Sequence, residues 1–171
     1  MKIVKWFNED EVKGSIDEWL KKFDSDSLDG AKDALLFYKA IGEAIVLSKQ
    51  SDDDDKKELS EIIGDDIEEY GSLAYFIEIR GHPEKIVMTM KPDEMKIGLW
   101  EGDYEPLPDC KQNVYMEMTP ACSLKILKGN PNTDAEFFAG DLTVKGPLKL
   151  ATKPRDWIAA YFDFVEREPV D

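Results

Sequence analysis

The spacing of hydrophobic residues divides the chain into a helical first part and a second part in which strands precede further helices. Before residue 73, apolar residues recur every three to four positions, which places them on one face of a helix. The first helix begins at Ser15, where Ser15 and Glu18 match the capping-box pattern, and ends near Phe23. Two longer helices are predicted over residues 31–49 and from residue 51 through residue 67.

From residue 73 the hydrophobic period changes to two, which is typical of strands that bury one face. Three strands follow one another with short turns between them, the pattern of an antiparallel meander. A long loop with two prolines leads to a fourth strand, and a fifth follows later in the chain. The predicted strands cover residues 73–80, 85–91, 95–101, 113–118 and 141–145.

The helices of the second part are marked by residues that favour helix ends. Thr119 and Pro120 are typical of the start of a helix, which Gly129 ends. Thr133 and Glu136 match a second capping box, which opens a short helix. The predicted helices begin near residues 120, 134, 148 and 154, and the last ends near residue 166.

Methionine is unusually frequent on the apolar face of the predicted sheet. Alternation places five of the six methionines there, where β-branched residues are the usual choice. Methionine is flexible and polarisable, and it is common at adaptable binding surfaces. Two interpretations follow: the face encloses a movable apolar guest, or it belongs to a solid core of soft side chains. The five residues are Met88, Met90, Met95, Met116 and Met118.

The order of elements over residues 73–164 resembles the sterol carrier protein 2 family of lipid-binding domains. The matching features are the meander, the long loop, the fourth strand and the helix that ends at Gly129. They continue with the pair Phe137-Phe138 and the short strand between Gly140 and Gly146. The resemblance implies an α+β fold, in which a five-stranded mixed, largely antiparallel sheet is covered by helices around a hydrophobic tunnel.

The resemblance also implies a set of tunnel residues, to which the methionines of the second predicted strand are added. A charged residue in place of Met116 or Phe138 is expected to abolish ligand uptake. The basic residues near a polar head group are expected to be Lys125, Lys128, Lys145, Lys149 and Lys153. The predicted ligand-binding residues are Met88, Met90, Met116, Met118, Leu124, Leu127, Phe137, Phe138, Leu142, Leu150 and Trp157.

The sequence departs from the family at both ends. We expect one domain over residues 1–171, with a helical N-terminal extension over residues 1–50 and a sterol-carrier-like core over residues 51–166. The extension has no clear counterpart in the family, so it either covers the tunnel or plugs it. Pro154 should break or kink the final helix, since proline removes a backbone hydrogen bond and clashes with the preceding turn.

The chain is strongly acidic, with 37 acidic against 22 basic residues and a net charge of −15. Such a charge repels nucleic acid and anionic membranes at long range. Residues 110–155 are the exception, with 7 basic and 4 acidic residues and a net charge of +3. The apolar run at residues 1–7 contains lysines, and acids follow it, which argues against a signal peptide. A cytoplasmic protein is expected.

No residue pattern indicates catalysis, a metal or another cofactor. His82 is the one histidine and falls in a predicted turn, while Cys110 and Cys122 form no Cys-x-x-Cys pair. Nucleotide-binding and zinc-protease motifs are absent. The sequence therefore predicts a lipid-binding or lipid-transfer protein that is not an enzyme and needs no cofactor.

The predicted ligand is a hydrophobic small molecule, a fatty acyl chain or another lipid. Nucleic acid is not expected as a partner, a membrane at most transiently, and a homodimer is left open. The first alternative function is a non-catalytic interaction or dimerisation module with a filled core. A third, weaker hypothesis is an enzyme of unknown reaction.

Overall fold

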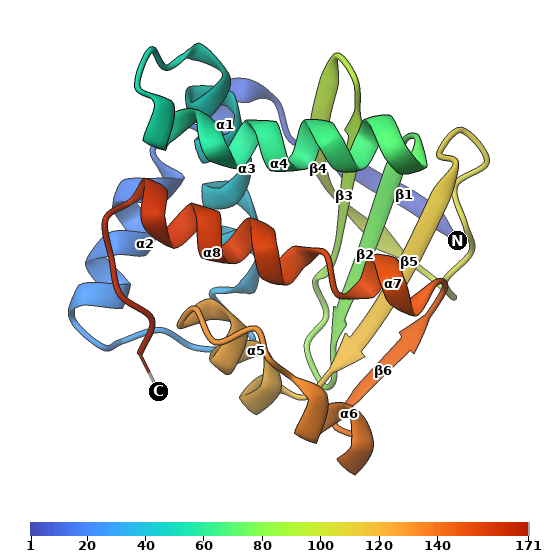
Figure 1. Cartoon of the computed structure of the whole chain (residues 1–171). Coiled ribbons are helices and arrows are strands. Elements are labelled where there is room, and N and C mark those ends of the chain that lie inside the picture. Colours follow the sequence, from blue (N-terminus) through green and yellow to red (C-terminus); the bar gives the residue numbers. More distant parts are fainter. Residues whose placement is uncertain (171) are drawn as a thin grey trace.

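A computed structural model describes residues 1–170 (Figure 1). Its strands are β1 (Lys2–Trp6), β2 (Leu73–Ile79), β3 (Lys85–Lys91), β4 (Glu94–Glu101), β5 (Gln112–Met118) and β6 (Leu142–Lys145). Its longer helices are α2 (Ser15–Asp24), α3 (Ala34–Gln50), α4 (Asp54–Tyr70), α5 (Pro120–Leu127) and α8 (Pro154–Phe164). Three short helices complete the fold, α1 (Glu9–Val12), α6 (Asp134–Ala139) and α7 (Leu148–Ala151).

The strands form one mixed sheet in the order β1-β4-β3-β2-β5-β6. The predicted meander is confirmed, because β2, β3 and β4 are neighbours and pair antiparallel. β5 lies on the other side of β2 and runs parallel to it, with Ile77 opposite Met116. β6 then pairs antiparallel with β5. The α+β class with a mixed, largely antiparallel sheet is therefore confirmed.

The described sheet has six strands, so the prediction of five is wrong. β1 pairs antiparallel with β4, which means that the predicted helical extension over residues 1–50 begins with a strand. The register shifts between Ile3 and Lys5, and this bulge lets Ile3 and Trp6 pack into one hydrophobic cluster. Apolar residues three positions apart do not alternate, so the strand has no period of two in the sequence.

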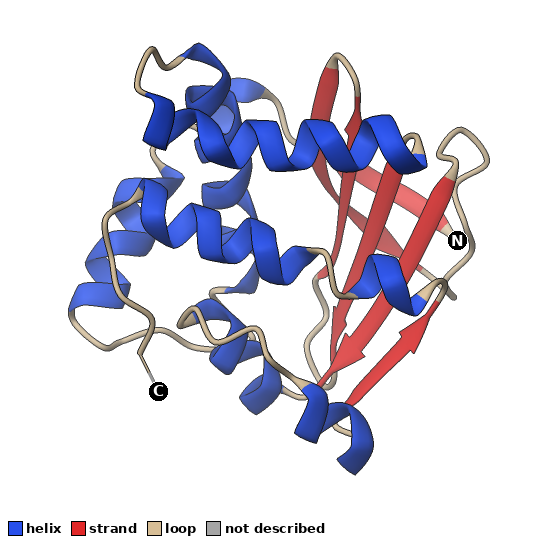
Figure 2. Ribbon diagram, viewed as in Figure 1, coloured by secondary structure: helices blue, strands red, loops and turns tan. Residues whose placement is uncertain are grey.

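The helices gather on one face of the sheet, as Figure 2 shows. The alternation predicted for the strands is confirmed there, because the expected apolar residues of β2 to β6 all belong to the cluster between sheet and helices. α3 belongs to the same cluster and lies close to β4: a Cβ atom on Gly42 would lie 2.7 Å from the Ile97 side chain. Thus α3, which was predicted to belong to the N-terminal extension, is part of the main core.

The opposite face of the sheet is closed by the chain itself. Phe76, Trp100 and Tyr115 are buried there, and β1 and the loop between β4 and β5 cover them. Tyr104 of that loop stacks on Tyr115 with ring centroids 4.8 Å apart. The indole of Trp100 donates to the Ile86 carbonyl oxygen at 3.0 Å. Any cavity that opens among the helices therefore lies on the other face.

Only one of the predicted side-chain caps is present. The Thr119 hydroxyl accepts from the Cys122 backbone N–H at 3.1 Å, as predicted for the start of α5. The predicted capping box at Ser15 is wrong, because a left-handed glycine is the N-cap of α2 and the Ser15 hydroxyl donates to the Val12 carbonyl. Thr133 makes no capping hydrogen bond, so the second box is wrong as well.

Pro154 separates α7 from α8, as predicted. Because the helix is interrupted, α7 is free to lie against β5 and β6 while α8 continues alongside α4. The Tyr75 hydroxyl of β2 donates to the Leu150 carbonyl oxygen at 2.7 Å and ties α7 to the sheet. No helix within residues 1–170 is long and apolar enough to cross a lipid bilayer.

Candidate functional site

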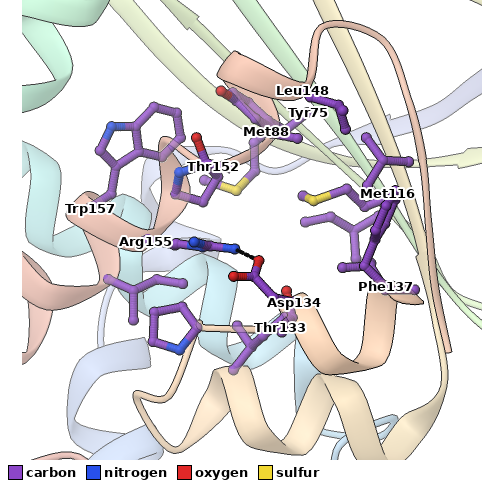
Figure 3. Close-up of a pocket in the computed structure, with 18 of the residues that line it drawn as sticks. Tyr75, Met88, Met116, Thr133, Asp134, Phe137, Leu148, Thr152, Arg155 and Trp157 are labelled. Atoms are coloured by element: carbon purple, nitrogen blue, oxygen red, sulfur yellow. Dashed lines mark hydrogen bonds and ion pairs between the residues drawn. The ribbon is translucent and has the colours of Figure 1, made fainter. Parts of the chain in front are cut away.

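A cavity of about 340 Å³ lies between the sheet and helices α3, α5, α6, α7 and α8 (Figure 3). We call it the pocket. It is lined by Tyr38, Ile41, Tyr75, Ile77, Met88, Met116, Ile126, Pro131, Thr133, Asp134, Phe137, Phe138, Leu142, Val144, Leu148, Ala151, Thr152, Pro154, Arg155, Trp157 and Ile158. The set is dominated by aliphatic and aromatic side chains, which is typical of sites for hydrophobic ligands.

The floor of the pocket is built by cross-strand neighbours of β3, β2, β5 and β6. Met88 lies opposite Tyr75, and Met116 lies between Ile77 and Val144. These residues share one face because side chains alternate along a strand. Two of them are methionines, whose unbranched side chains change rotamer readily. The floor can therefore adjust to the shape of an apolar guest.

The back wall comes from α3, which the sequence placed in the N-terminal extension. Tyr38 and Ile41, one turn apart on α3, both line the pocket. Tyr38 is buried. Burial raises the pKa of Tyr38 far above its usual value, so the hydroxyl stays protonated. α3 narrows the pocket without filling it.

We call six lining residues the rim of the pocket: the five exposed ones and the half-buried Arg155, which pairs with one of them. They are Asp134, Phe137, Phe138, Leu148, Thr152 and Arg155. Large apolar groups are exposed on it, since Phe138 is 86% and Leu148 is 59% accessible. Arg155 of α8 donates from Nη2 to Oδ1 of Asp134 on α6 at 2.5 Å (Figure 3). The rim thus combines exposed apolar side chains with one ion pair.

Trp157, which forms the side of the pocket on α8, is held by a buried carboxylate on α4. Its indole N–H donates to Oδ2 of Asp66 at 2.8 Å, and Lys153 Nζ lies 3.5 Å from the other carboxylate oxygen. The indole also meets the Tyr75 ring edge-on, with centroids 5.0 Å apart. These contacts fix the distance between α8 and the sheet, and with it the width of the pocket.

Removing the Asp66 carboxylate should destabilise the protein. In Asp66→Ala the buried indole N–H of Trp157 loses its acceptor, which typically costs about 1–3 kcal/mol. Asp65→Ala is the matched control, because its side chain is exposed and should change stability by less than about 0.5 kcal/mol. Urea denaturation followed by circular dichroism measures both. Equal stability of the two variants would contradict the role assigned to Asp66.

The structure brings together about half of the residues that the sequence predicted as ligand contacts. Met88, Met116, Phe137, Phe138, Leu142 and Trp157 line the pocket. Met90, Met118, Leu124, Leu127 and Leu150 do not.

The five residues outside the pocket have identifiable surroundings. Met90, Met118, Leu127 and Leu150 are buried in the core, away from the cavity. Leu124 packs against the Gly30 backbone on the outer side of α5. These residues lie outside the pocket because the apolar face of a strand or helix contains more residues than a cavity contacts. Among the lining residues that were not predicted, Tyr75 and Ile77 had a sequence signal, since the period of two over residues 73–80 puts positions 75 and 77 on the same, apolar side of the strand.

The five lysines expected near a head group do not line the pocket, and several of them make contacts elsewhere. Lys125 pairs with Glu136 at 3.0 Å, and Lys128 lies 3.5 Å from Asp26. Lys153 forms an ion pair with Asp66. The remaining two lie over aromatic rings, Lys145 over Tyr115 and Lys149 over Tyr70.

The reactive side chains of the described residues are poorly placed for chemistry. Cys110 and Cys122 are free and buried, and burial raises the pKa of the Cys122 thiol to about 11. A thiol with so high a pKa is a weak nucleophile near neutral pH. His82 Nε2 lies 3.4 Å from Glu84 in its turn, and His82 is not among the residues that line the pocket. What the site offers is an apolar volume with a partly polar rim.

A family model described as the SCP-2 sterol transfer family matches residues 47–157. Among solved structures, this chain is similar to apo sterol carrier protein 2 from Yarrowia lipolytica, with a TM-score of 0.46 and 11% identity over 72% of this chain and 90% of that chain. The UbiJ-SCP2 ubiquinone synthesis protein gives a TM-score of 0.40 and 13% identity over 61% of this chain and 77% of that chain.

The solution structure of sterol carrier protein domain 2 from Helicoverpa armigera gives a TM-score of 0.38 and 18% identity. That likeness covers 73% of this chain and 91% of that chain. Comparison with curated proteins gives no match.

Proposed function

Because this chain belongs to the SCP-2 sterol transfer family, we propose that it binds and transfers lipid by holding one hydrocarbon chain in the pocket. The proposed ligand is a fatty acyl chain or an apolar chain of similar size, which the protein binds non-covalently and does not convert. The observation that carries this proposal is the unfilled apolar cavity between the methionine-containing floor and the helices. The alternative interaction module requires a filled core at this place.

The size of the pocket favours a chain over a sterol. A cavity of about 150 Å³ holds one benzene molecule, which corresponds to about 25 Å³ per carbon atom. The 340 Å³ of this pocket therefore accommodate about 14 carbon atoms. A sterol has about twice that number. A single acyl chain fits the pocket as it stands, whereas a sterol requires it to widen.

Burial alone gives such a chain useful affinity. About 14 methylene groups gain roughly 11 kcal/mol at about 0.8 kcal/mol each. Association costs at least about 4 kcal/mol, so at most about 7 kcal/mol remains, which corresponds to a dissociation constant on the order of 10 μM. The exposed Phe137, Phe138 and Leu148 of the rim suit transient contact with a membrane during uptake or release.

Two measurements test this proposal. Native mass spectrometry of the purified protein should show a co-purified lipid of one mass class or, after delipidation, uptake of one tetradecanoic acid per chain. A fluorescent fatty acid should be bound and then displaced by unlabelled tetradecanoic acid in the micromolar range. If the protein carries no adduct and takes up no probe, the pocket is not a lipid site, and the interaction module becomes the better interpretation.

A further inference from the structure

Arg155 is the one positively charged residue among those that line the pocket, all of which lie in the described part of the chain. It sits on the first turn of α8, at the rim, and its side chain is 34% exposed. Figure 3 shows its guanidinium group between Trp157 and Asp134, reaching across the opening toward α6. A polar head group that stays at the rim while its chain enters the pocket would therefore meet this guanidinium.

The hydrogen bonds of Arg155 leave most of its donors available. A guanidinium carries five N–H groups, and within residues 1–170 Arg155 makes a single hydrogen bond, from Nη2 to Asp134. The Nε and Nη1 groups have no partner there. Each pair of adjacent N–H groups in a guanidinium includes one on Nη2, and only one of the two Nη2 N–H groups is used by Asp134. The other Nη2 N–H, together with the adjacent N–H on Nε or Nη1, can match the two oxygen atoms of a carboxylate. The site can thus accept a second carboxylate without any change in the fold.

Asp134 competes only weakly with a ligand carboxylate for the guanidinium of Arg155. Its side chain is 63% exposed on the short helix α6, and ion pairs in such positions contribute little to stability. A ligand carboxylate at the mouth of an apolar cavity is less well hydrated than Asp134, so its attraction to the guanidinium is screened less. An incoming anion can share Arg155 with Asp134 or replace it. Replacement would also release the contact that joins α6 to α8 across the rim.

We propose that Arg155 selects ligands with a carboxylate head group, and that its ion pair with Asp134 is a latch across the pocket that this head group opens. The inference rests on the proposed function, because it assumes that the hydrocarbon chain occupies the pocket. It goes further in naming the ligand as a free fatty acid and Arg155 as the residue that determines specificity. Arg155 and Asp134 are the two charged residues among the described residues that line the pocket, so Asp134 is the one lining side chain that competes with a ligand anion for Arg155.

The test compares tetradecanoic acid with tetradecanol, which has the same chain and a neutral head group. Both are measured by displacement of a neutral fluorescent lipid probe at pH 7.5. Wild-type protein should bind the acid at least tenfold more tightly than the alcohol. Arg155→Gln should weaken binding of the acid about tenfold and leave the alcohol unchanged. Asp134→Asn removes the competitor and should strengthen binding of the acid by a few fold.

The matched control is Arg167→Gln. Arg167 also forms an ion pair with an exposed aspartate, Asp24, at 2.9 Å, but it lies outside the pocket. This variant should keep the wild-type preference for the acid. Arg155→Lys retains the charge and loses the paired donors, so it should fall between wild type and Arg155→Gln, and it replaces Arg155→Gln if the latter does not fold.

Four outcomes are informative. Equal affinity of wild-type protein for acid and alcohol overturns the inference and leaves the proposed function intact. Equal weakening of both ligands by Arg155→Gln also overturns it, since a loss of pocket shape affects both. Failure of wild-type protein to bind either ligand contradicts the proposed function itself. A loss confined to the acid supports Arg155 as the determinant of specificity.

Discussion

Replacing Ala151 with tryptophan is expected to reduce binding of a fourteen-carbon chain at least 100-fold while the protein stays folded. Ala151 is half-buried at the end of α7 and lines the pocket. The nine ring atoms of an indole occupy about 225 Å³ at about 25 Å³ per atom, which is most of the 340 Å³ available. Room then remains for about five carbon atoms, and each methylene group left in water forfeits about 0.8 kcal/mol.

The matched control for this variant is Ala121→Trp. Ala121 is an exposed alanine on α5 outside the pocket, so the same substitution should leave ligand binding unchanged. Displacement of the fluorescent fatty acid gives the affinities, and thermal unfolding by circular dichroism confirms that both variants fold. If Ala151→Trp binds the acid as tightly as wild type, the ligand does not occupy this pocket.

Replacing Gly30 with alanine is expected to destabilise the protein by about 3 kcal/mol or more. A Cβ atom at this buried position would lie 2.0 Å from the Pro120 carbonyl oxygen and 2.8 Å from the Leu124 backbone nitrogen. Both atoms belong to the backbone of α5, so no flexible side chain can yield. The Ser123 hydroxyl also donates to the Gly30 carbonyl oxygen at 2.5 Å, and moving the two segments apart breaks this bond. The substitution therefore pushes α5 away from the segment that leads into α3.

Gly64→Ala is the control for Gly30→Ala, and it is expected to change stability in the opposite direction. Gly64 is an exposed residue inside α4, and nothing lies within 4 Å of the Cβ atom that the substitution adds. Because alanine favours a helix over glycine by about 1 kcal/mol, this variant should be stabilised by up to that amount. Urea denaturation curves measure both changes. Unaltered stability of Gly30→Ala would show that α5 does not pack as closely on residue 30 as described.

The sequence predicted most of the elements because each helix and strand leaves a periodic trace in its own residues. The period of two in β2 and β3 correctly placed Tyr75, Ile77, Met88 and Met90 on one face of the sheet. Pro154 acts through local geometry, and the break between α7 and α8 followed from it. β1 was not predicted because the bulge at Val4 puts Ile3 and Trp6 on the same side of the sheet, so the strand shows no period of two in the sequence. The capping box at Ser15 failed because a preceding glycine had already begun the helix.

The composition of the pocket shows where local pattern stops being informative. Met88 and Met90 share a strand, a face and a residue type, yet only Met88 lines the cavity. The pattern within β3 does not distinguish them, because it does not contain the packing of the helices over the sheet. Tyr38 and Ile41 read as part of one amphipathic helix, and nothing in their spacing placed that helix against the sheet beside Met88. Arg155 and Asp134, 21 positions apart, meet because α6 and α8 converge at the rim.

The amino-acid sequence by itself determined the secondary structure of the second part, the buried face of each predicted strand and the family to which the order of elements belongs. These properties depend on side-chain polarity and on neighbours along the chain, which the sequence contains directly. Only the tertiary structure decided that β1 completes the sheet, that α3 forms a wall of the pocket and that Arg155 faces the opening. A cavity is the space that packed elements leave unfilled, so its lining depends on how distant segments meet and not on the pattern within any one of them.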